Sequence, residues 1–128
     1  YVLGALKKAR ELGAIPLGIT CNPDTPLTRA CDMPIVVLSG PEVVTGSTRM
    51  KAGTAQKLIL NMLSTCAMIQ TGKVRENLMI NVRPTNIKLV NRAIRIIRQL
   101  HECTEEEAKA ALEQSGNDVA KALELLEG

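Results

Sequence analysis

The residues best suited to chemistry lie in one segment, residues 42–57, where hydroxyl groups and cations surround a glycine. Ser47 and Thr48 stand where we expect a long helix to begin. Backbone N–H groups at a helix start, with hydroxyls beside them, favour anions. Arg49 and Lys51 add positive charge, so the segment predicts a site for phosphate or a phosphorylated sugar. The alternative is an ordinary helix cap beside solvated cations.

Two further side chains have types that occur in active sites. Glu42, the first residue of this segment, could orient a sugar hydroxyl or move a proton. The alternative is a solvated carboxylate or a surface salt bridge. His101, the only histidine, lies two residues from Cys103, and this pair lacks the further ligands of a metal site. We expect no metal site, and no nucleophile, base and acid combine into a catalytic triad.

Charge divides the chain into two parts. Residues 1–100 hold 14 Lys and Arg against 5 Asp and Glu, whereas residues 101–128 hold 2 against 8. The positive part includes a basic run on one expected helix (Lys88, Arg92, Arg95 and Arg98). Because the chain has one aromatic residue and no nucleic-acid module, we expect no nucleic-acid partner. A solvated face, or docking of the acidic segment, is favoured instead.

The elements that must position these residues alternate between helix and strand in the first half. Apolar spacing and turn signals predict helices at 2–12, 26–30, 48–71, 87–101, 104–114 and 117–126, with strands at 14–20 and 34–38. A weaker extended segment is expected at 78–82. Alternating strands and helices indicate an α/β fold with a parallel sheet. Two evident strands are few for a stable sheet, so we expect exposed edges and core surface.

The amino-acid composition indicates the class of protein. The 128 residues are 45% hydrophobic and 23% charged, which is typical of a globular chain. The longest apolar stretch, residues 58–69, is too short to cross a bilayer, so no membrane span is expected. Four scattered cysteines without a Cys-x-x-Cys pair favour a reduced, cytoplasmic setting. The chain starts inside an expected helix without Met, which suggests a piece of a longer protein.

The 42–57 segment and the residues after it resemble a known family. The Gly-Ser-Thr-Arg-Met-Lys-Ala-Gly core is similar to the signature of N-acetylmuramic acid 6-phosphate etherases, which glucokinase regulatory protein shares in variant form. The likeness covers essentially the whole chain and continues through Leu58, Asn61, Met62, Leu63, Ser64, Thr65, Gly72, Lys73, Val74, Asn77, Leu78, Met79, Thr85 and Asn86.

This resemblance implies a sugar isomerase (SIS) fold acting as a homodimer, in which flanking helices cover a five-stranded parallel sheet. It also implies cleavage of the D-lactyl ether of N-acetylmuramic acid 6-phosphate, giving N-acetylglucosamine 6-phosphate and D-lactate during peptidoglycan recycling. The family uses carboxylates and no metal or cofactor, and its acid/base glutamates precede this chain. By motif match, the residues around the phosphorylated amino sugar are Glu42, Ser47, Thr48, Arg49 and Lys51, whereas Lys57, further along the same helix, is interpreted as structural.

The expected organisation is the later part of an SIS domain at 1–84, then a small helical unit at 85–128 that resembles a three-helix ubiquitin-associated (UBA) domain. The expected function is that of part of an etherase, which contributes sugar-phosphate binding and the dimer interface. We expect the fragment alone to be inactive. The alternative is a non-catalytic regulatory SIS protein that senses a sugar phosphate.

Overall fold

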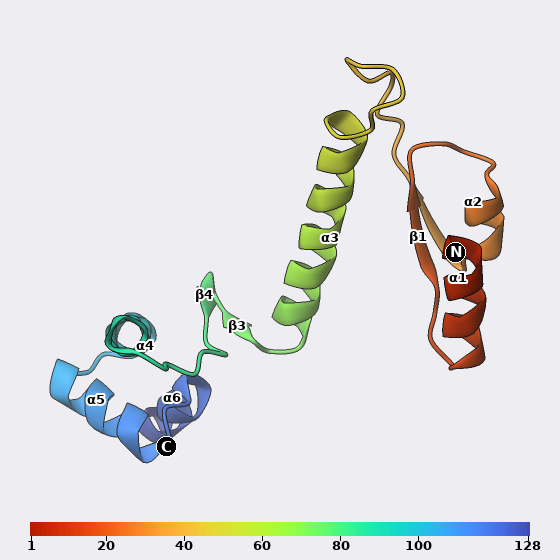
Figure 1. Cartoon of the computed structure of the whole chain (residues 1–128). Helices are drawn as coiled ribbons and strands as arrows, with labels where there is room; N and C mark the ends of the chain where they lie inside the picture. Colours follow the sequence, from red (N-terminus) through yellow and green to blue (C-terminus); the bar gives the residue numbers. More distant parts are fainter. The chain divides into compact units, whose positions relative to one another are not determined.

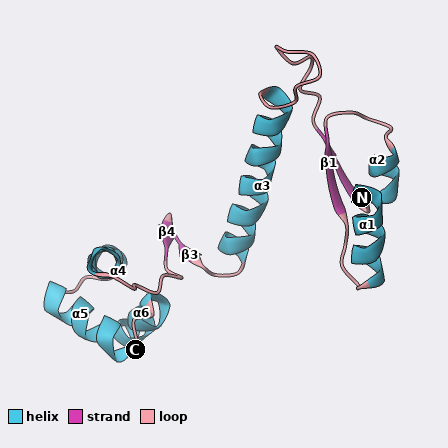
Figure 2. Cartoon of the chain, viewed as in Figure 1, coloured by secondary structure: helices cyan, strands magenta, loops and turns pink.

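The computed structural model describes all residues, 1–128, as an α/β chain of six helices and four short strands (Figures 1 and 2). It divides into two units, residues 1–63 and 64–128. The elements are α1 (Val2–Glu11), β1 (Leu17–Thr20), α2 (Pro26–Ala30), β2 (Met33–Val36), α3 (Lys51–Gln70), β3 (Val74–Arg75), β4 (Leu78–Met79), α4 (Ile87–Leu100), α5 (Glu105–Gln114) and α6 (Val119–Glu127).

The first unit is built on two parallel strands joined by a short helix. β1 pairs with β2 in register from Leu17 opposite Met33 to Thr20 opposite Val36. α2 starts where Thr25 accepts a hydrogen bond from the N–H of Thr28, with a proline at its first position. The expected parallel pairing is therefore present, with only two strands in this sheet.

Close packing behind these strands depends on a glycine. A Cβ added to Gly18 would lie 2.8 Å from the Sγ of Cys31, which is too close for any larger residue without movement. α1 is fastened to the same region by Arg10, whose guanidinium donates to the carbonyl oxygen of Ala30 at 3.0 Å and to the carboxylate of Asp32 at 2.6 Å. These contacts hold α1 beside the crossover from β1 to β2.

α3 is the longest helix and is largely exposed. Of its 20 residues only Ile59 is buried. Six of its large apolar side chains are 40% or more exposed: Leu58, Leu60, Met62, Leu63, Met68 and Ile69. The sequence has no charged residue between Lys57 and Gln70. An apolar surface of this extent is typical of a helix that packs against other protein. None of the helices combines the length and the apolar character that a membrane span requires.

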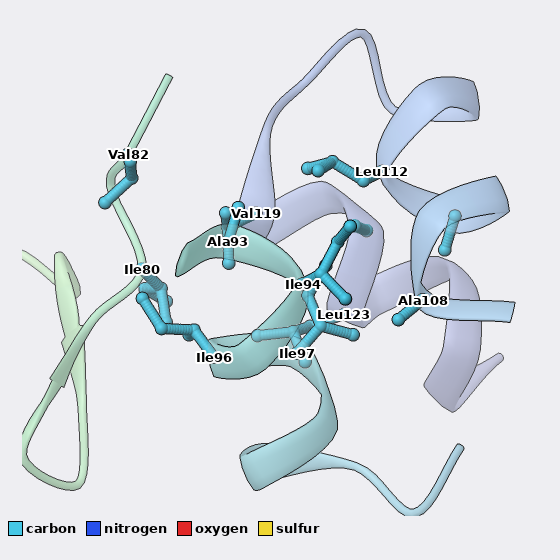
Figure 3. Close-up of a cluster of buried hydrophobic side chains, with 12 residues drawn as sticks. Ile80, Val82, Ala93, Ile94, Ile96, Ile97, Ala108, Leu112, Val119 and Leu123 are labelled. Atoms are coloured by element: carbon cyan, nitrogen blue, oxygen red, sulfur yellow. The ribbon is translucent and has the colours of Figure 1, made fainter. Parts of the chain in front are cut away.

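The second unit contains the hydrophobic core. β3 and β4 form an antiparallel hairpin, and Ile80 and Val82, directly after it, are buried with residues of α4, α5 and α6. Figure 3 shows these side chains converging from the three helices and the extended segment. Ile97, Leu112, Val119 and Leu123 are the largest side chains that are fully buried. The unit therefore has an interior of its own.

Local signals in the sequence fix the helix ends of this unit. Thr104 accepts a hydrogen bond from the N–H of Glu107, and the Glu107 carboxylate accepts from the N–H and hydroxyl of Thr104, forming the expected capping box. The backbone and then the side-chain hydrogen bond of Thr104 lower the pKa of Glu107. The side-chain oxygens of Asn86 and Asp118 cap α4 and α6 by accepting the N–H groups of Leu89 and Lys121.

The acidic and basic parts of the chain meet at two surface ion pairs within this unit. Arg98 of the basic helix pairs with Glu105 at 3.6 Å, and Arg75 pairs with Glu127. The other basic side chains of α4 (Lys88, Arg92 and Arg95) are exposed. Docking of the acidic segment is thus seen at Arg98, and the rest of that face is solvated.

Three expectations compare with the structure as follows. The α/β class is confirmed. α3 begins at Lys51 rather than at Ser47 or Thr48, because the carboxylate of Glu42 caps its first N–H groups. The expected division at 84/85 stays a prediction, although Ile80 and Val82 pack with the helices that follow it and the chain divides by contacts after residue 63.

Candidate functional site

Two adjoining hollows lie in the first unit where its parallel strands end. One, of about 280 Å³, is lined by the end of β1, Val37 and the first turns of α3; the other, of about 330 Å³, is lined by the 21–23 turn, the 38–40 segment and Glu42. Four residues line both hollows: Cys21, Asn22, Thr48 and Ala52. The carboxyl ends of parallel strands are the usual ligand-binding edge of an open α/β sheet.

The start of α3 is capped by a carboxylate from nine residues upstream. The backbone N–H of Lys51 donates to Oε2 of Glu42, and that of Ala52 donates to Oε1, each at 3.0 Å. The Lys51 ammonium donates to the carbonyl oxygen of Pro41 at 2.8 Å. The first free N–H groups of the helix, which we expected to receive a phosphate, are therefore taken up by Glu42.

These contacts also set the charge of Glu42. The hydrogen bond from the Lys51 N–H, then that from the Ala52 N–H, lowers its pKa, and the positive charge of Lys51 acts in the same direction. Glu42 is therefore ionised at neutral pH. A carboxylate held in this way by backbone donors is a poor general acid or base, because the hydrogen bonds favour its charged form.

The five residues expected around a ligand lie close in sequence but have different surroundings. Glu42 and Thr48 line the hollows, whereas Ser47, Arg49 and Lys51 line neither. The Ser47 N–H donates to the carbonyl oxygen of Val44, and the Thr48 carbonyl oxygen accepts the N–H of Gly53. Arg49 is exposed. Thr48 is thus the hydroxyl-bearing residue of this segment that lines the candidate site.

Several lining residues were read from the sequence only as parts of a turn or a helix. Cys21, Asn22 and Pro23 belong to the turn after β1, and Gln56 lies on the second turn of α3. The signal that could have found the first three is their position at the end of an apolar strand of a parallel sheet. Gln56 has no comparable signal, because its placement depends on where α3 begins.

The first hollow is lined by neutral polar residues, whereas the lining of the second includes the ionised Glu42. Thr20, Asn22, Thr48 and Gln56 supply hydroxyl and amide groups to the first hollow. No group of three or more His, Cys, Asp or Glu side chains is placed to hold a metal ion. The arrangement suits recognition of oxygen-rich, uncharged or weakly charged parts of a ligand by hydrogen bonds.

Comparison with known proteins identifies relatives along nearly the whole chain. An N-acetylmuramic acid 6-phosphate etherase of Aeromonas hydrophila is 54% identical over 126 residues, which is 98% of this chain and 42% of the relative. Etherase 2 of Vibrio cholerae is 50% identical over 123 residues, covering 96% and 40%. That of Serratia proteamaculans is 52% identical over 123 residues, covering 96% and 41%.

The chain is therefore similar in sequence to part of these N-acetylmuramic acid 6-phosphate etherases. It spans about two fifths of the length of the curated relatives it matches. Residues 76–126 also match the model of the C-terminal lid domain of glucokinase regulatory protein. This match lies within the second unit, so both parts of the expected family relation are present, and the hollows belong to the etherase-like segment that precedes it.

Proposed function

We propose that the parent of this chain is a lyase that cleaves the D-lactyl ether of N-acetylmuramic acid 6-phosphate. Its products are N-acetylglucosamine 6-phosphate and D-lactate, as expected for amino-sugar metabolism in peptidoglycan recycling. The observation that carries this proposal is the identity of 50% or more to relatives bearing the etherase name over at least 96% of the chain. The reaction needs no cofactor from this portion.

The same proposal assigns this portion a binding role. The ligand-binding set consists of residues that contact the phosphorylated amino sugar or position a neighbouring residue that contacts it. These residues are Glu42, Ser47, Thr48, Arg49 and Lys51. Thr48 contacts the ligand from the wall shared by the two hollows. Arg49, which is exposed, offsets ligand charge from the loop. The acid/base carboxylates come from the part of the parent that the relatives contain before this portion, so residues 1–128 alone are inactive.

The proposed setting is an SIS domain in a cytoplasmic homodimer. Two observations support it. The parallel β1–β2 pair joined by α2 is a fragment of the expected kind of sheet, with its flanking α1 in place. The exposed apolar side chains of α3 provide the surface that an assembly would cover. α4, α5 and α6 form the small UBA-like unit of the proposal, and its role is packing rather than ubiquitin binding.

The function is tested with the purified full-length parent. Incubation with N-acetylmuramic acid 6-phosphate is expected to release D-lactate in an amount equal to the substrate consumed, as measured with a D-lactate dehydrogenase assay. Residues 1–128 alone are expected to release none. If the parent binds the substrate but releases no lactate, the etherase assignment is wrong. Activity from residues 1–128 alone would show that the acid/base carboxylates are in this portion.

A non-catalytic sensor of sugar phosphates is the second candidate. Residues 76–126 match the model of the lid domain of glucokinase regulatory protein, and this match is compatible with both candidates. The assay above separates the two, because a sensor binds the sugar phosphate and leaves the ether intact. Sedimentation of the parent tests the dimer: a monomer at micromolar concentration contradicts the proposed assembly.

The binding role is tested by removing hydroxyl groups. Thr48→Ala in the parent is expected to raise the KM for the 6-phosphate substrate about tenfold, because one hydrogen bond to the ligand is lost. Thr45→Ala is the matched control, since Thr45 is exposed in the same loop and lines neither hollow. Equal KM values for the two variants would contradict a ligand contact by Thr48.

A further inference from the structure

The loop between Glu42 and α3 is closed by hydrogen bonds between the residues on its two sides. The Glu42 carboxylate accepts the N–H groups of Lys51 and Ala52, and the Lys51 ammonium donates to the carbonyl oxygen of Pro41. Residues 43–50 therefore form a loop whose flanking residues, Pro41 and Glu42 before it and Lys51 and Ala52 after it, are joined by three hydrogen bonds. We call residues 43–50 the capped loop.

Thr48 lies inside the capped loop, at the point where it returns to α3. Its carbonyl oxygen accepts the Gly53 N–H at 3.0 Å. A Cβ on Gly53 would lie 3.3 Å from that oxygen, so the approach of the loop to the helix is close. Thr48 also lines both hollows. The position of the Thr48 side chain therefore depends on how the loop is held against α3.

The geometry distinguishes this role from two others. A ligand contact by Glu42 would use the oxygens that already accept two backbone N–H groups. A phosphate bound at the first N–H groups of α3 would have to displace this carboxylate, since both are anions seeking the same donors. Neither arrangement uses Glu42 as the structure places it.

We infer that Glu42 is a positioning residue: by capping α3 from nine residues upstream, it holds the capped loop so that Thr48 faces the hollows. This inference rests on the proposed function for its ligand, but the loop geometry stands without it. Its consequence is specific. Loss of the Glu42 carboxylate harms binding through Thr48 and through no contact of its own.

The first test follows the loop itself and needs no ligand. Amide hydrogen exchange in the full-length parent is measured for Glu42→Gln, whose side chain retains only one acceptor oxygen. The Lys51 and Ala52 amides are expected to exchange at least about tenfold faster than in the unmodified chain. Glu11→Gln is the matched control, because Glu11 pairs only with Lys8 on α1. Unchanged exchange at both amides would overturn the inference.

The second test is a double-mutant cycle in the full-length parent, with D-lactate release as the readout. Glu42→Gln and Thr48→Val are each expected to raise KM about tenfold with kcat changed less than twofold. Because Glu42 acts through Thr48, the double variant is expected to match the Thr48→Val variant rather than multiply the two effects. Glu42→Asp, which keeps both oxygens, is expected to recover part of the loss.

The remaining outcomes contradict either the positioning role of Glu42 or the proposed function. A double variant whose KM rises about a hundredfold shows an independent ligand contact by Glu42 and overturns the positioning role. A lowered KM in Glu42→Gln shows competition between the carboxylate and the ligand phosphate, which also overturns it. If the unmodified parent releases no lactate, the proposed function fails, and the amide-exchange result still decides how the loop is held. Melting curves of each variant confirm that it is folded.

Discussion

The two units of this chain hold very different shares of its hydrophobic interior. Of the 14 buried hydrophobic residues, 12 lie in residues 64–128, and the first unit contributes Cys31 and Ile59. The first unit carries the candidate site but exposes apolar side chains on α1, β2 and α3. The candidate site and the hydrophobic core thus lie in separate parts of the chain. The unit that carries the candidate site depends on further contacts for its own stability.

The largest effect expected from this comparison concerns folding of the two units as separate peptides. Residues 64–128 are expected to unfold cooperatively on heating, because they enclose four fully buried large side chains. Residues 1–63 are expected to show no cooperative transition, since two strands and largely exposed helices bury too little apolar surface. Circular dichroism during heating measures both. A cooperative transition in residues 1–63 would contradict the comparison.

The next effect tests the interior of the second unit. Leu112→Ala is expected to lower the free energy of unfolding by about 2–5 kcal/mol, because Leu112 is 1% exposed and its truncation leaves a cavity. Leu125→Ala, at a side chain that is 54% exposed, is the matched control and should change it by less than about 0.5 kcal/mol. Urea titration measures both. Similar losses would show that the unit is packed differently.

A smaller effect is expected at the capping box of α5. Thr104→Ala is expected to cost about 1 kcal/mol in the unfolding of the second unit, because the N–H of Glu107 loses its acceptor. The pKa of Glu107 is lowered in the folded state, so its stabilising effect is complete above the unfolded glutamate value of 4.5 and is lost as the pH falls through the lowered value.

The pH dependence can be measured with a matched pair. Stability of the second unit is followed by urea titration between neutral and strongly acidic pH. Glu107→Gln is expected to weaken the loss of stability on acidification, whereas Glu113→Gln, whose side chain makes no capping contact, is expected to leave it unchanged. Equal behaviour of the two variants would show that the capping box is not formed in solution.

The smallest expected effect is stabilising. Glu76 in the hairpin turn has a φ of 55°, in the left-handed region that favours glycine. Glu76→Gly is expected to raise the free energy of unfolding by no more than about 1 kcal/mol, since relief of strain is partly offset by greater freedom in the unfolded chain. Lys109→Gly, within α5, is the contrasting control and is expected to lower it by about 1 kcal/mol. Thermal unfolding measures the difference.

Local signals explain what could be predicted from the sequence. The start of α2 follows from Thr25 and Pro26, and that of α5 from Thr104 and Glu107, because each signal acts within one helical turn. The start of α3 could not be predicted in this way. Its cap is Glu42, which is nine residues away, so the pattern of Ser47 and Thr48 suggested an earlier start.

The hairpin and the site were missed in part for related physical reasons. β3 was not expected because its turn uses Glu76 in a left-handed conformation, where Asn or Gly is the usual signal. The hydroxyl segment of the candidate site was recognised, but Cys21 and Asn22, which line the same hollows, were not predicted as site residues. Their role depends on the pairing of β1 with β2, which is a contact between distant residues.

The exposed side chains also have a chemical consequence. All five methionines are among the exposed large hydrophobic residues: Met33, Met50, Met62, Met68 and Met79. Thioethers that solvent reaches are open to oxidation to the sulfoxide. Each methionine is therefore a reporter whose rate of reaction with peroxide, read by mass spectrometry, falls when a neighbour covers it. Met62 and Met68, at two heights along α3, would map the covered part of that helix in the parent residue by residue.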